Sequence, residues 1–415
     1  MQTLRVGIIG GGAAGMMTAM IIKEFRPETE VLLFEKNPGL GAKVIISGGG
    51  RCNVTTGISD VEEVLKRYPR GTHFLKYAMY TFSPSHVYEW FEAHGVKLKI
   101  EKDLRVFPRS DEGKEVVGMF EKFFGKTGVE MHMRTGIKTI QKNTEGFTLS
   151  DGNKTYEVNT LVITTGGNAY RHTGSTGDGY AFARDLGHTI TELGPSLTSF
   201  ITKEKWGARL AGITHPDVRL QASKKDGTRA EFRGAMLWTH KGITGPAVFA
   251  LSAQLAFEKI DAAHILPITI DFKPDISLQE VEKHIFETIA ESPKKLFVST
   301  LHHFVQKSLA GIVMEQLSLP MERRNNEVAH KFVRLAAECI THFPLHLAAR
   351  GVGDEFVTAG GVDTVEVNPK TMQSRICPGL YFAGEILNVD GFTGGFNLQA
   401  SWAEGYLAGA AIAAL

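Results

Sequence analysis

At the start of the chain, apolar residues form a short continuous run, then a longer stretch, and then a second short run. Val6–Ile9 is a short hydrophobic run, and such a run is typical of a buried parallel strand. An arginine precedes it and a glycine follows it. Ala13–Phe25 is apolar over a length that favours a helix, and Val31–Phe34 forms the next run directly before Glu35. This order predicts a strand–helix–strand unit over residues 1–36.

Glycines occupy the turn between the first apolar run and the helix. Gly10, Gly12 and Gly15 fit the spacing G-x-G-x-x-G. In this motif the first glycine permits a tight turn, the second lets the backbone approach a diphosphate, and the third lets the helix pack on the strand. The Glu35 carboxylate can accept hydrogen bonds from ribose hydroxyls and would repel a 2′-phosphate. The unit is therefore predicted to bind FAD or NAD rather than NADP.

Farther along, the pattern of buried strands and helices typical of an α/β domain is interrupted near residues 193–195. It resumes near residue 351. A buried strand at 161–164 leads into Thr165-Gly166-Gly167, whereas residues 196–272 alternate like antiparallel strands and 277–341 has helical periodicity. A buried strand at 380–385 and a last helix from about residue 397 follow. We predict an α/β fold in which a Rossmann-type FAD-binding domain is made from both chain ends. The predicted boundaries are 1–192 and 351–415 for its two parts, and 193–350 for an insertion that is β-rich over 193–275 and helical over 276–342.

Three features favour FAD over NAD. The turn after Thr164 can close over the adenosine side of the cofactor. Glu385 follows a strand and can bind a ribityl hydroxyl, which only a flavin cofactor supplies. The segment Gly394–Gln399 opens the last helix, and a helix N-terminus can stabilise negative charge at the flavin N1/C2=O edge by about 0.3–2 kcal/mol. A second strand–glycine–helix motif for NAD(P)H is absent from the sequence, so a nicotinamide donor would dock in the substrate cleft.

Composition narrows the classes of partner. The 415 residues carry a formal net charge of +1, from 46 basic and 45 acidic side chains, which gives no general attraction to nucleic acid or to an anionic membrane. Cys52, Cys339 and Cys377 lie far apart, which argues against a disulfide framework or a zinc site and suits a reducing compartment. The apolar stretch at 407–415 is too short to span a bilayer. We expect a cytoplasmic protein without a metal, a nucleic-acid partner or a membrane anchor.

The chain also resembles a known family over essentially its whole length. The motifs that carry the resemblance follow one another in the order Gly10–Gly15, Ser47–Asn53, Thr173–Tyr180, Thr239–Pro246, Thr358–Val362, Thr371–Ser374, Gly379–Glu385 and Gly394–Gln399. They resemble the bacterial and archaeal flavoproteins described as aminoacetone-oxidase-like, or as NAD(P)/FAD-dependent oxidoreductases with an insertion domain. The resemblance implies an FAD-binding domain interrupted by a β-barrel-like and a helical subdomain. It also implies kinship with amine oxidases and with reductases of steroid-like enones.

The motifs and the resemblance together predict a set of residues around one FAD molecule, in which Lys43 is expected to reach the diphosphate. The set comprises Gly10, Gly12, Ala13, Ala14, Gly15, Glu35, Lys36, Lys43, Ser47, Gly48, Gly49, Arg51, Cys52, Asn53, Ile137, Thr165, Gly166, Gly167, Gly384, Glu385, Gly395, Phe396, Asn397 and Leu398. Ala42, Thr56, Asn388 and Phe396 depart from the family pattern near the predicted flavin. The resemblance therefore identifies the cofactor better than the substrate.

Arg51 and His240 are the candidate catalytic residues. The Arg51 guanidinium could hold a substrate carboxylate or a flavin oxygen, and the alternative is a surface arginine. His240 lies between an apolar strand end and the segment Gly242–Pro246, so its ring could donate a proton near neutral pH or could hydrogen-bond a turn. Tyr170, Arg171 and His172 could line the cleft. Cys52 has no second thiol nearby and is more typical of a packed small residue than of a redox centre.

We expect a non-covalent FAD oxidoreductase that transfers hydride to or from a small molecule. Enone (C=C) reduction and amine oxidation are the two leading reactions, with NAD(P)H as the candidate electron donor. A flavin-dependent RNA-modifying enzyme is a second hypothesis. It requires a continuous basic surface, and the near-neutral charge argues against that. A third hypothesis is a non-catalytic FAD-binding redox sensor. The sequence specifies neither the substrate nor the oligomeric state.

Overall fold

The computed structural model describes residues 4–351 and 356–415. The chain folds into two compact units, of which the first contains Met1–Pro195 and Phe356–Leu415 and the second contains Ser196–Glu355. The first unit is thus built from both chain ends. The predicted fold class is confirmed, because this unit contains a parallel sheet with α/β organisation and the second contains a closed barrel.

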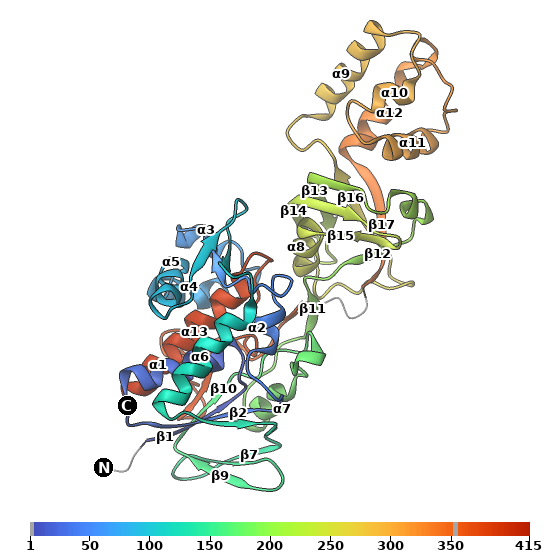
Figure 1. Cartoon of the computed structure of the whole chain (residues 1–415). Helices are drawn as coiled ribbons and strands as arrows, with labels where there is room; N and C mark the ends of the chain where they lie inside the picture. Colours follow the sequence, from blue (N-terminus) through green and yellow to red (C-terminus); the bar gives the residue numbers. More distant parts are fainter. Residues whose placement is uncertain (1–3, 352–355) are drawn as a thin grey trace. The chain divides into compact units, whose positions relative to one another are not determined.

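A five-stranded parallel sheet forms the centre of the first unit (Figure 1). Its spatial order is β19 (Leu380–Phe382), β10 (Thr160–Ile163), β1 (Arg5–Ile9), β2 (Glu30–Glu35) and β6 (Glu130–Met133). Val6, Ile8, Leu161 and Val162 are fully buried, as expected for strands covered on both faces. Because the strands are parallel, the segments that follow β1, β2, β10 and β19 all emerge at one edge of the sheet.

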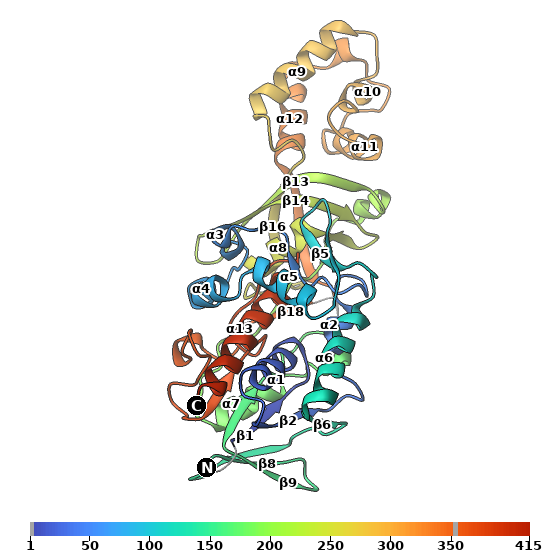
Figure 2. The ribbon, with the colours of Figure 1, turned by 60° about the vertical axis from the view of Figure 1, so that its left-hand side comes forward.

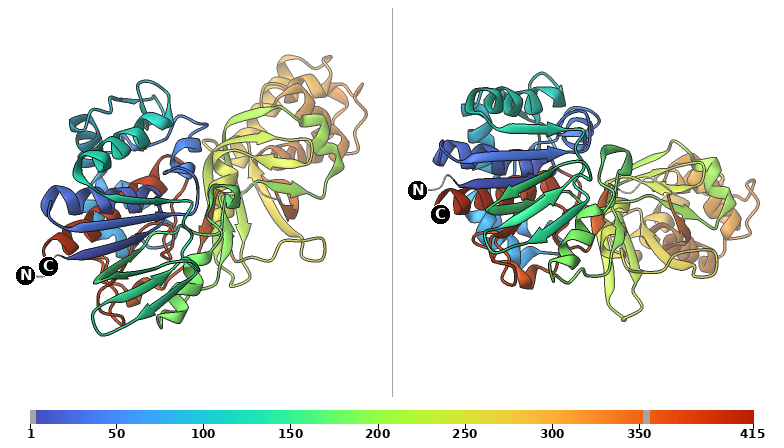
Figure 3. Two further views of the ribbon diagram at one scale, coloured as in Figure 1. Left: turned by 60° about the horizontal axis from the view of Figure 1, so that its bottom comes forward. Right: turned by 90° about the horizontal axis from the view of Figure 1, so that it is seen from below.

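Helices cover one face of this sheet, and a three-stranded antiparallel sheet covers the other (Figures 1 and 3). α1 (Ala13–Phe25) and α13 (Phe396–Ala413) lie side by side (Figure 2). Their close approach depends on small residues, because a Cβ at Gly405 would lie 2.6 Å from Ala14 O and one at Gly409 would lie 2.9 Å from Thr18 O. The antiparallel sheet consists of β7 (Thr139–Lys142), β8 (Phe147–Ser150) and β9 (Thr155–Val158).

Shorter elements complete the first unit. The helices are α2 (Ala42–Ile46), α3 (Val61–Leu65), α4 (Thr72–Thr81), α5 (Pro84–Ala93), α6 (Gly113–Thr127) and α7 (Asp178–Asp185). The strands are β3 (Thr55–Thr56), β4 (Leu98–Ile100) and β5 (Arg105–Pro108), which form one small sheet, and β11 (Gly194–Ser196), which pairs with β18 (Val357–Ala359).

A closed barrel forms the strand-rich part of the second unit. Its order is β12 (Phe200–Thr202), β15 (Gly242–Thr244), β14 (Arg229–Trp238), β13 (Thr214–Ser223), β16 (Leu266–Asp271) and β17 (Phe343–Arg350). Two elements here differ from the sequence-based expectations. The run Pro246–Gln254 is a helix, α8, and the strand that closes the barrel, β17, comes after the helical segment rather than before it.

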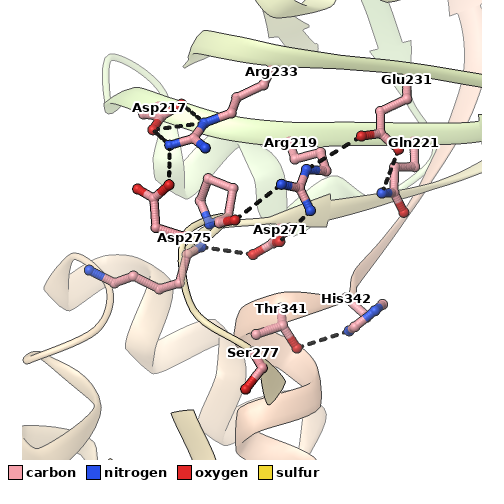
Figure 4. A network of polar contacts seen from close by, with 12 residues as sticks. Asp217, Arg219, Gln221, Glu231, Arg233, Asp271, Asp275, Ser277, Thr341 and His342 are labelled. Atoms are coloured by element: carbon pink, nitrogen blue, oxygen red, sulfur yellow. Dashed lines mark hydrogen bonds and ion pairs between the residues drawn. The ribbon is translucent and has the colours of Figure 1, made fainter. Parts of the chain in front are cut away.

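Four helices extend the second unit beyond the barrel: α9 (Leu278–Glu291), α10 (Phe297–Leu301), α11 (Lys307–Gln316) and α12 (His330–Thr341). They share one buried apolar core with the barrel, to which Phe272 and Phe343 belong. Where β16 leads into α9, charged side chains of the barrel bind the connecting loop (Figure 4). Arg233 contacts both Asp217, at 2.6 Å, and Asp275, at 2.7 Å.

Within residues 4–351 and 356–415, the longest helices are too short or too polar to cross a membrane. The same residues contain no cluster of three metal-ligating side chains. Cys52, Cys339 and Cys377 are all free thiols.

Candidate functional site

The glycine turn after β1 combines two very close backbone contacts with one open position. A Cβ at Gly10, which has φ +109°, would lie 2.4 Å from Thr164 O, and one at Gly15 would lie 1.9 Å from Gly10 O. At Gly12 the same atom would meet nothing within 4 Å. Gly12 is the N-cap of α1 and supplies no side-chain cap. The first-turn N–H groups, including those of Ala13 and Ala14, are therefore presented to a ligand that can approach the backbone closely.

Glu35 is held next to this turn at the end of β2. Its Oε2 accepts a hydrogen bond from Gly11 N at 2.9 Å and its Oε1 accepts one from Asn37 N at 2.8 Å. Each oxygen keeps a lone pair, so the fixed carboxylate can still accept hydrogen bonds from the hydroxyls of a ribose. Lys36 instead points to the start of α7, where its Nζ contacts Asp178 at 2.6 Å.

Ile137 lies beyond β6, in a segment tied to the end of β2. Thr135 N donates to Glu35 O at 2.9 Å, and Ile137 itself is 8% exposed. The structure therefore brings Ile137 to the same sheet edge as Glu35. An apolar side chain at that place could cover one face of an adenine ring.

Glu385 lies where three other segments of the first unit come close together. Its Oε2 accepts from Lys43 Nζ at 2.7 Å, and its Oε1 accepts from Thr358 N at 2.8 Å. Gly167 lies against both partners, because a Cβ there would be 2.6 Å from Thr358 Oγ1 and 3.0 Å from Glu385 Oε1. The predicted residues of α2, of the turn after β10 and of the turn after β19 are thus brought together.

The loop Ser47–Asn53 winds back on itself through glycines with positive φ and through Cys52, which has φ +61°. Cys52 N donates to Ser47 O at 2.9 Å. Cys52 is fully buried, and burial raises the pKa of its thiol to about 12. The thiol therefore stays protonated, which fits a packed small residue. Gly48 and Gly49 lie in the same turn and have φ +58° and +74°.

Arg51 is engaged within the first unit. Its Nη1 lies 2.7 Å from Glu101 Oε1 and 3.4 Å from Asp111 Oδ1, and the guanidinium carbon lies 3.8 Å from the Phe107 ring centroid. These partners raise the pKa of Arg51, with the Glu101 hydrogen bond as the largest cause. To bind a substrate carboxylate, Arg51 would have to exchange at least one of these partners.

The start of α13 packs against the strand β3. Its N-cap Gly395 has φ +92°, and a Cβ there would lie 2.3 Å from Thr55 O. With the Asn53 amide turned to the orientation that satisfies both its oxygen and its nitrogen, the oxygen accepts a hydrogen bond from Gly395 N at 2.9 Å. Asn397 closes the preceding loop, since its side chain bonds both Gly391 N and Gly391 O at 2.8 Å. The first turn, with Phe396 and Leu398, contains no acidic residue that would oppose a developing negative charge.

His240 belongs to the other unit. It is exposed and lies in the turn between β14 and β15 of the barrel. Its neighbour Thr239 caps this turn, because its Oγ1 accepts from Gly242 N at 3.0 Å. The other residues of the predicted set, from Gly10 to Leu398, all lie in the first unit.

Sequence reasoning missed three residues of the first unit. Thr358 lies in a motif of the family resemblance, but only the fold shows its bonds to Glu385 and to Asn168 N, the latter at 2.7 Å. Tyr180 is buried beside Thr358 and Glu385, and burial raises its pKa. Glu404 is the one charged residue of α13 and is fully buried. A lone acid in an otherwise apolar helix is a signal that the sequence does contain.

This geometry fits an FAD molecule. A diphosphate needs free backbone N–H groups and an approach without a Cβ, and Gly12 at the start of α1 offers both. Thr165 Oγ1 is buried at the same edge without a hydrogen-bond partner in the part of the chain that the structure describes. Such a group is normally satisfied by a ligand or by water.

Comparisons with known proteins agree with this geometry. A family model described as "HI0933-like protein Rossmann domain" matches residues 4–411. The 3-dehydro-bile acid delta(4,6)-reductase of Clostridium scindens is 29% identical over 410 residues and covers 99% of both chains. The ribosomal RNA dihydrouridine synthase of Escherichia coli is 28% identical over 403 residues and covers 96% of this chain and 95% of its own.

Solved structures share the fold at low identity. The 3-ketosteroid delta1-dehydrogenase of Sterolibacterium denitrificans matches with a TM-score of 0.52 and 13% identity, with full coverage of both chains. A flavocytochrome c3 fumarate reductase matches with a TM-score of 0.51 and 17% identity, over all of this chain and 78% of its own.

Family and fold support FAD as the cofactor and an oxidoreductase as the class of protein, as the sequence predicts. The narrower description as aminoacetone-oxidase-like stays a prediction. With a match that spans nearly its whole length, the chain belongs to the HI0933-like Rossmann family of flavoproteins.

Proposed function

We propose that this protein reduces a carbon–carbon double bond conjugated to a carbonyl group in a small molecule. The observation that carries the proposal is full-length similarity to relatives named for two such reductions. One is a 3-dehydro-bile acid delta(4,6)-reductase, and the others are dihydrouridine synthases. A 3-oxo-4-ene and a uracil ring share the same reactive unit, in which hydride adds to the carbon β to a carbonyl. Amine oxidation, the other reaction expected from the sequence, has no such support.

The proposed cofactor site has one task for each segment. Gly10–Gly15 and the first turn of α1 would bind the diphosphate, and Glu35 the ribose hydroxyls. Lys43 and Glu385 would bind polar groups between the diphosphate and the flavin ring. The N-terminus of α13 at Gly395 would stabilise negative charge at the pyrimidine side of the ring. FAD supplies the hydride chemistry when it is bound.

One side chain of the first unit is proposed to act on the substrate. Arg51 would orient an oxygen of the substrate after exchanging Glu101 or Asp111 as its partner. His240, in the turn between β14 and β15 of the barrel, stays the sequence-based candidate for the proton donor. NAD(P)H is the proposed electron donor.

Anaerobic spectroscopy tests the proposal. The FAD-loaded protein is mixed with NADH or NADPH, the flavin absorbance near 450 nm is followed, and a 3-oxo-4-ene steroid is then added. We expect bleaching by one nicotinamide and recovery of the band with formation of saturated ketone. Bleaching by an amine, with none by either nicotinamide, would overturn the proposal in favour of an oxidase. Failure to take up FAD would overturn the cofactor assignment itself.

Uridine in RNA is the second candidate substrate. The ribosomal RNA dihydrouridine synthases of Escherichia coli and Haemophilus influenzae are each 28% identical to this chain, close to the value for the bile acid reductase. Mass spectrometry of nucleosides from ribosomal RNA treated with the reduced protein decides between the two. Dihydrouridine in the RNA, without turnover of small enones, would replace the small-molecule proposal.

A further inference from the structure

Glu404 is an acid buried in an apolar helix pair. It is the one charged residue of α13 and is 0% exposed. At the neighbouring Gly405, α13 approaches α1 so closely that a Cβ would lie 2.6 Å from Ala14 O. The Glu404 side chain is therefore shielded from water at the level of the first turn of α1.

One oxygen of Glu404 is anchored and the other is not. Oε2 accepts a hydrogen bond from Gly384 N at 2.6 Å. Oε1 is buried and has no hydrogen-bond partner within the described residues. An ionised carboxylate with one bond in such a place is unfavourable, whereas a neutral carboxylic acid is tolerated more easily.

The anchoring group belongs to the predicted cofactor site. Gly384 precedes Glu385, and a Cβ at Gly384 would lie 3.0 Å from the Ala14 Cβ. Gly384 and Ala14 are both in the set expected to surround FAD. Glu404 thus lies directly behind two of the segments expected to bind FAD, those of Gly384 and Ala14, on the side away from solvent.

Among the residues that the structure describes, few charged or titratable groups face Glu404. The first turn of α1 has no acidic residue. On the loop after β19, Glu385 is paired with Lys43, and near the start of α4, Arg70 is paired with Asp390. The Tyr68 phenol is the titratable group that faces Glu404, and the interaction raises the pKa of Tyr68 further than burial alone does. Burial raises the pKa of Glu404 to about 8.

We infer that Glu404 is a positioning residue of the cofactor site, and that it must be neutral for FAD to bind tightly. When Glu404 is ionised, its charge lies behind the segments that hold the negative diphosphate, with little water to screen the repulsion. Linkage makes the effect reciprocal, so bound FAD favours the protonated form of Glu404 by the same factor. The inference rests on the assignment of FAD, and not on the proposed reaction.

Titration of the apoprotein with FAD at several pH values tests this inference. Flavin fluorescence gives the dissociation constant between pH 6.5 and 9.5 for the wild type and for Glu404→Gln, which keeps the shape and the acceptor for Gly384 N. If bound FAD raises the pKa of Glu404 by about one unit, the affinity of the wild type for FAD should fall roughly tenfold as the pH rises above 8. We expect the affinity of Glu404→Gln to change little over this range. Glu89→Gln, at an exposed position of α5, is the matched control and should behave like the wild type.

Calorimetry gives a second readout that does not depend on a variant. At pH 8.5 the wild type should take up a fraction of a proton on binding FAD, as measured in two buffers with different ionisation enthalpies, and Glu404→Gln should not. Equal pH dependence in the wild type and in Glu404→Gln, or no pH dependence in either, would overturn the inference while leaving FAD as the cofactor. A protein that binds no FAD at any pH would instead overturn the cofactor assignment.

Discussion

The two units each bury a titratable side chain, but with opposite consequences for stability. In the first unit burial raises the pKa of Glu404 to about 8, and in the second burial lowers the pKa of His215 to about 4. Glu404 is protonated more readily in the folded state than in the unfolded state, so its contribution is lost as the pH rises from about 4 through 8. His215 is deprotonated more readily in the folded state, so its contribution is lost as the pH falls from about 6.5 through 4.

The two units also differ in where their polar and charged side chains lie. In the first unit, carboxylates are held by backbone N–H groups at one edge of the sheet, where the hydroxyl groups of a cofactor can reach them. In the second unit, the interior is apolar apart from groups such as His215, which accepts a hydrogen bond from Trp238 Nε1 at 3.1 Å. The charged pairs there lie outside the barrel. Substitutions at this edge of the first unit should therefore affect cofactor binding, and substitutions in the interior of the barrel should affect stability alone.

Gly15→Ala should have the largest effect and should damage the first unit only. Its Cβ would lie 1.9 Å from Gly10 O, so helix α1 would have to move away from the sheet. We expect FAD affinity to fall more than about 100-fold, as measured by flavin fluorescence. Gly12→Ala is the control, because a Cβ there meets nothing within 4 Å and should leave thermal unfolding of the apoprotein unchanged. Tight FAD binding by Gly15→Ala would contradict this view of the turn.

Phe343→Ala should have the next largest effect, which is a loss of stability of the second unit. Phe343 is 0% exposed in the strand that closes the barrel, with its ring centroid 5.6 Å from that of Phe272. Loss of the ring should cost about 3–5 kcal/mol in urea unfolding. Leu335→Ala, at a position 42% exposed on α12, should cost far less. FAD affinity at low temperature should be unchanged, and a parallel loss of affinity would break the division between the two units.

His215→Gln should remove the sensitivity of the barrel to acid. With the pKa lowered from 6.5 to about 4, the wild type should lose about 2 kcal/mol between pH 8 and pH 5. Glutamine can still accept the hydrogen bond from Trp238, and it does not titrate. Unfolding at the two pH values measures the effect, with His284→Gln on the exposed face of α9 as the control. If His215→Gln loses as much stability between pH 8 and pH 5 as the wild type, another titratable residue causes the acid sensitivity.

Arg233→Ala should have the smallest effect. Its side chain is 40% exposed, and its partners Asp217 and Asp275 are exposed as well (Figure 4). Exposed ion pairs contribute little because water and salt screen them, so Tm should change by less than about 2 °C. A larger loss, abolished by 1 M salt, would show that the loop before α9 depends on this pair.

The parallel sheet and its glycine turn could be predicted because their signals are local. Gly10, Gly15 and Glu35 follow from spacing alone, since a strand, a tight turn and a helix need particular residues at particular positions. The return of the chain end to the sheet was also predicted, from the buried run before Glu385. That the Glu385 carboxylate accepts from both Lys43 and Thr358 required the fold, because Lys43 lies 342 positions from Glu385 and Thr358 lies 27 positions from it.

The barrel was harder to predict, for two physical reasons. Pro344 within Phe343–Arg350 obscures the alternation of buried Phe343, Leu345 and Leu347, so β17 was not expected to close the barrel. α8 is buried over most of its surface, and a helix without a polar face has no period that distinguishes it from a strand. In both cases the missing information is the identity of the packing partner.

The shared sheet has a consequence for biosynthesis. β19 and α13 are synthesised long after β1, α1 and β10, yet β19 pairs with β10 and α13 packs against α1. Residues 196–355 are synthesised in full before β19 and α13, which the N-terminal part of the first unit needs as packing partners. Domains generally fold as units during translation. We therefore expect the barrel to fold before the first unit is complete, so flavin loading has to follow synthesis of β19 and α13.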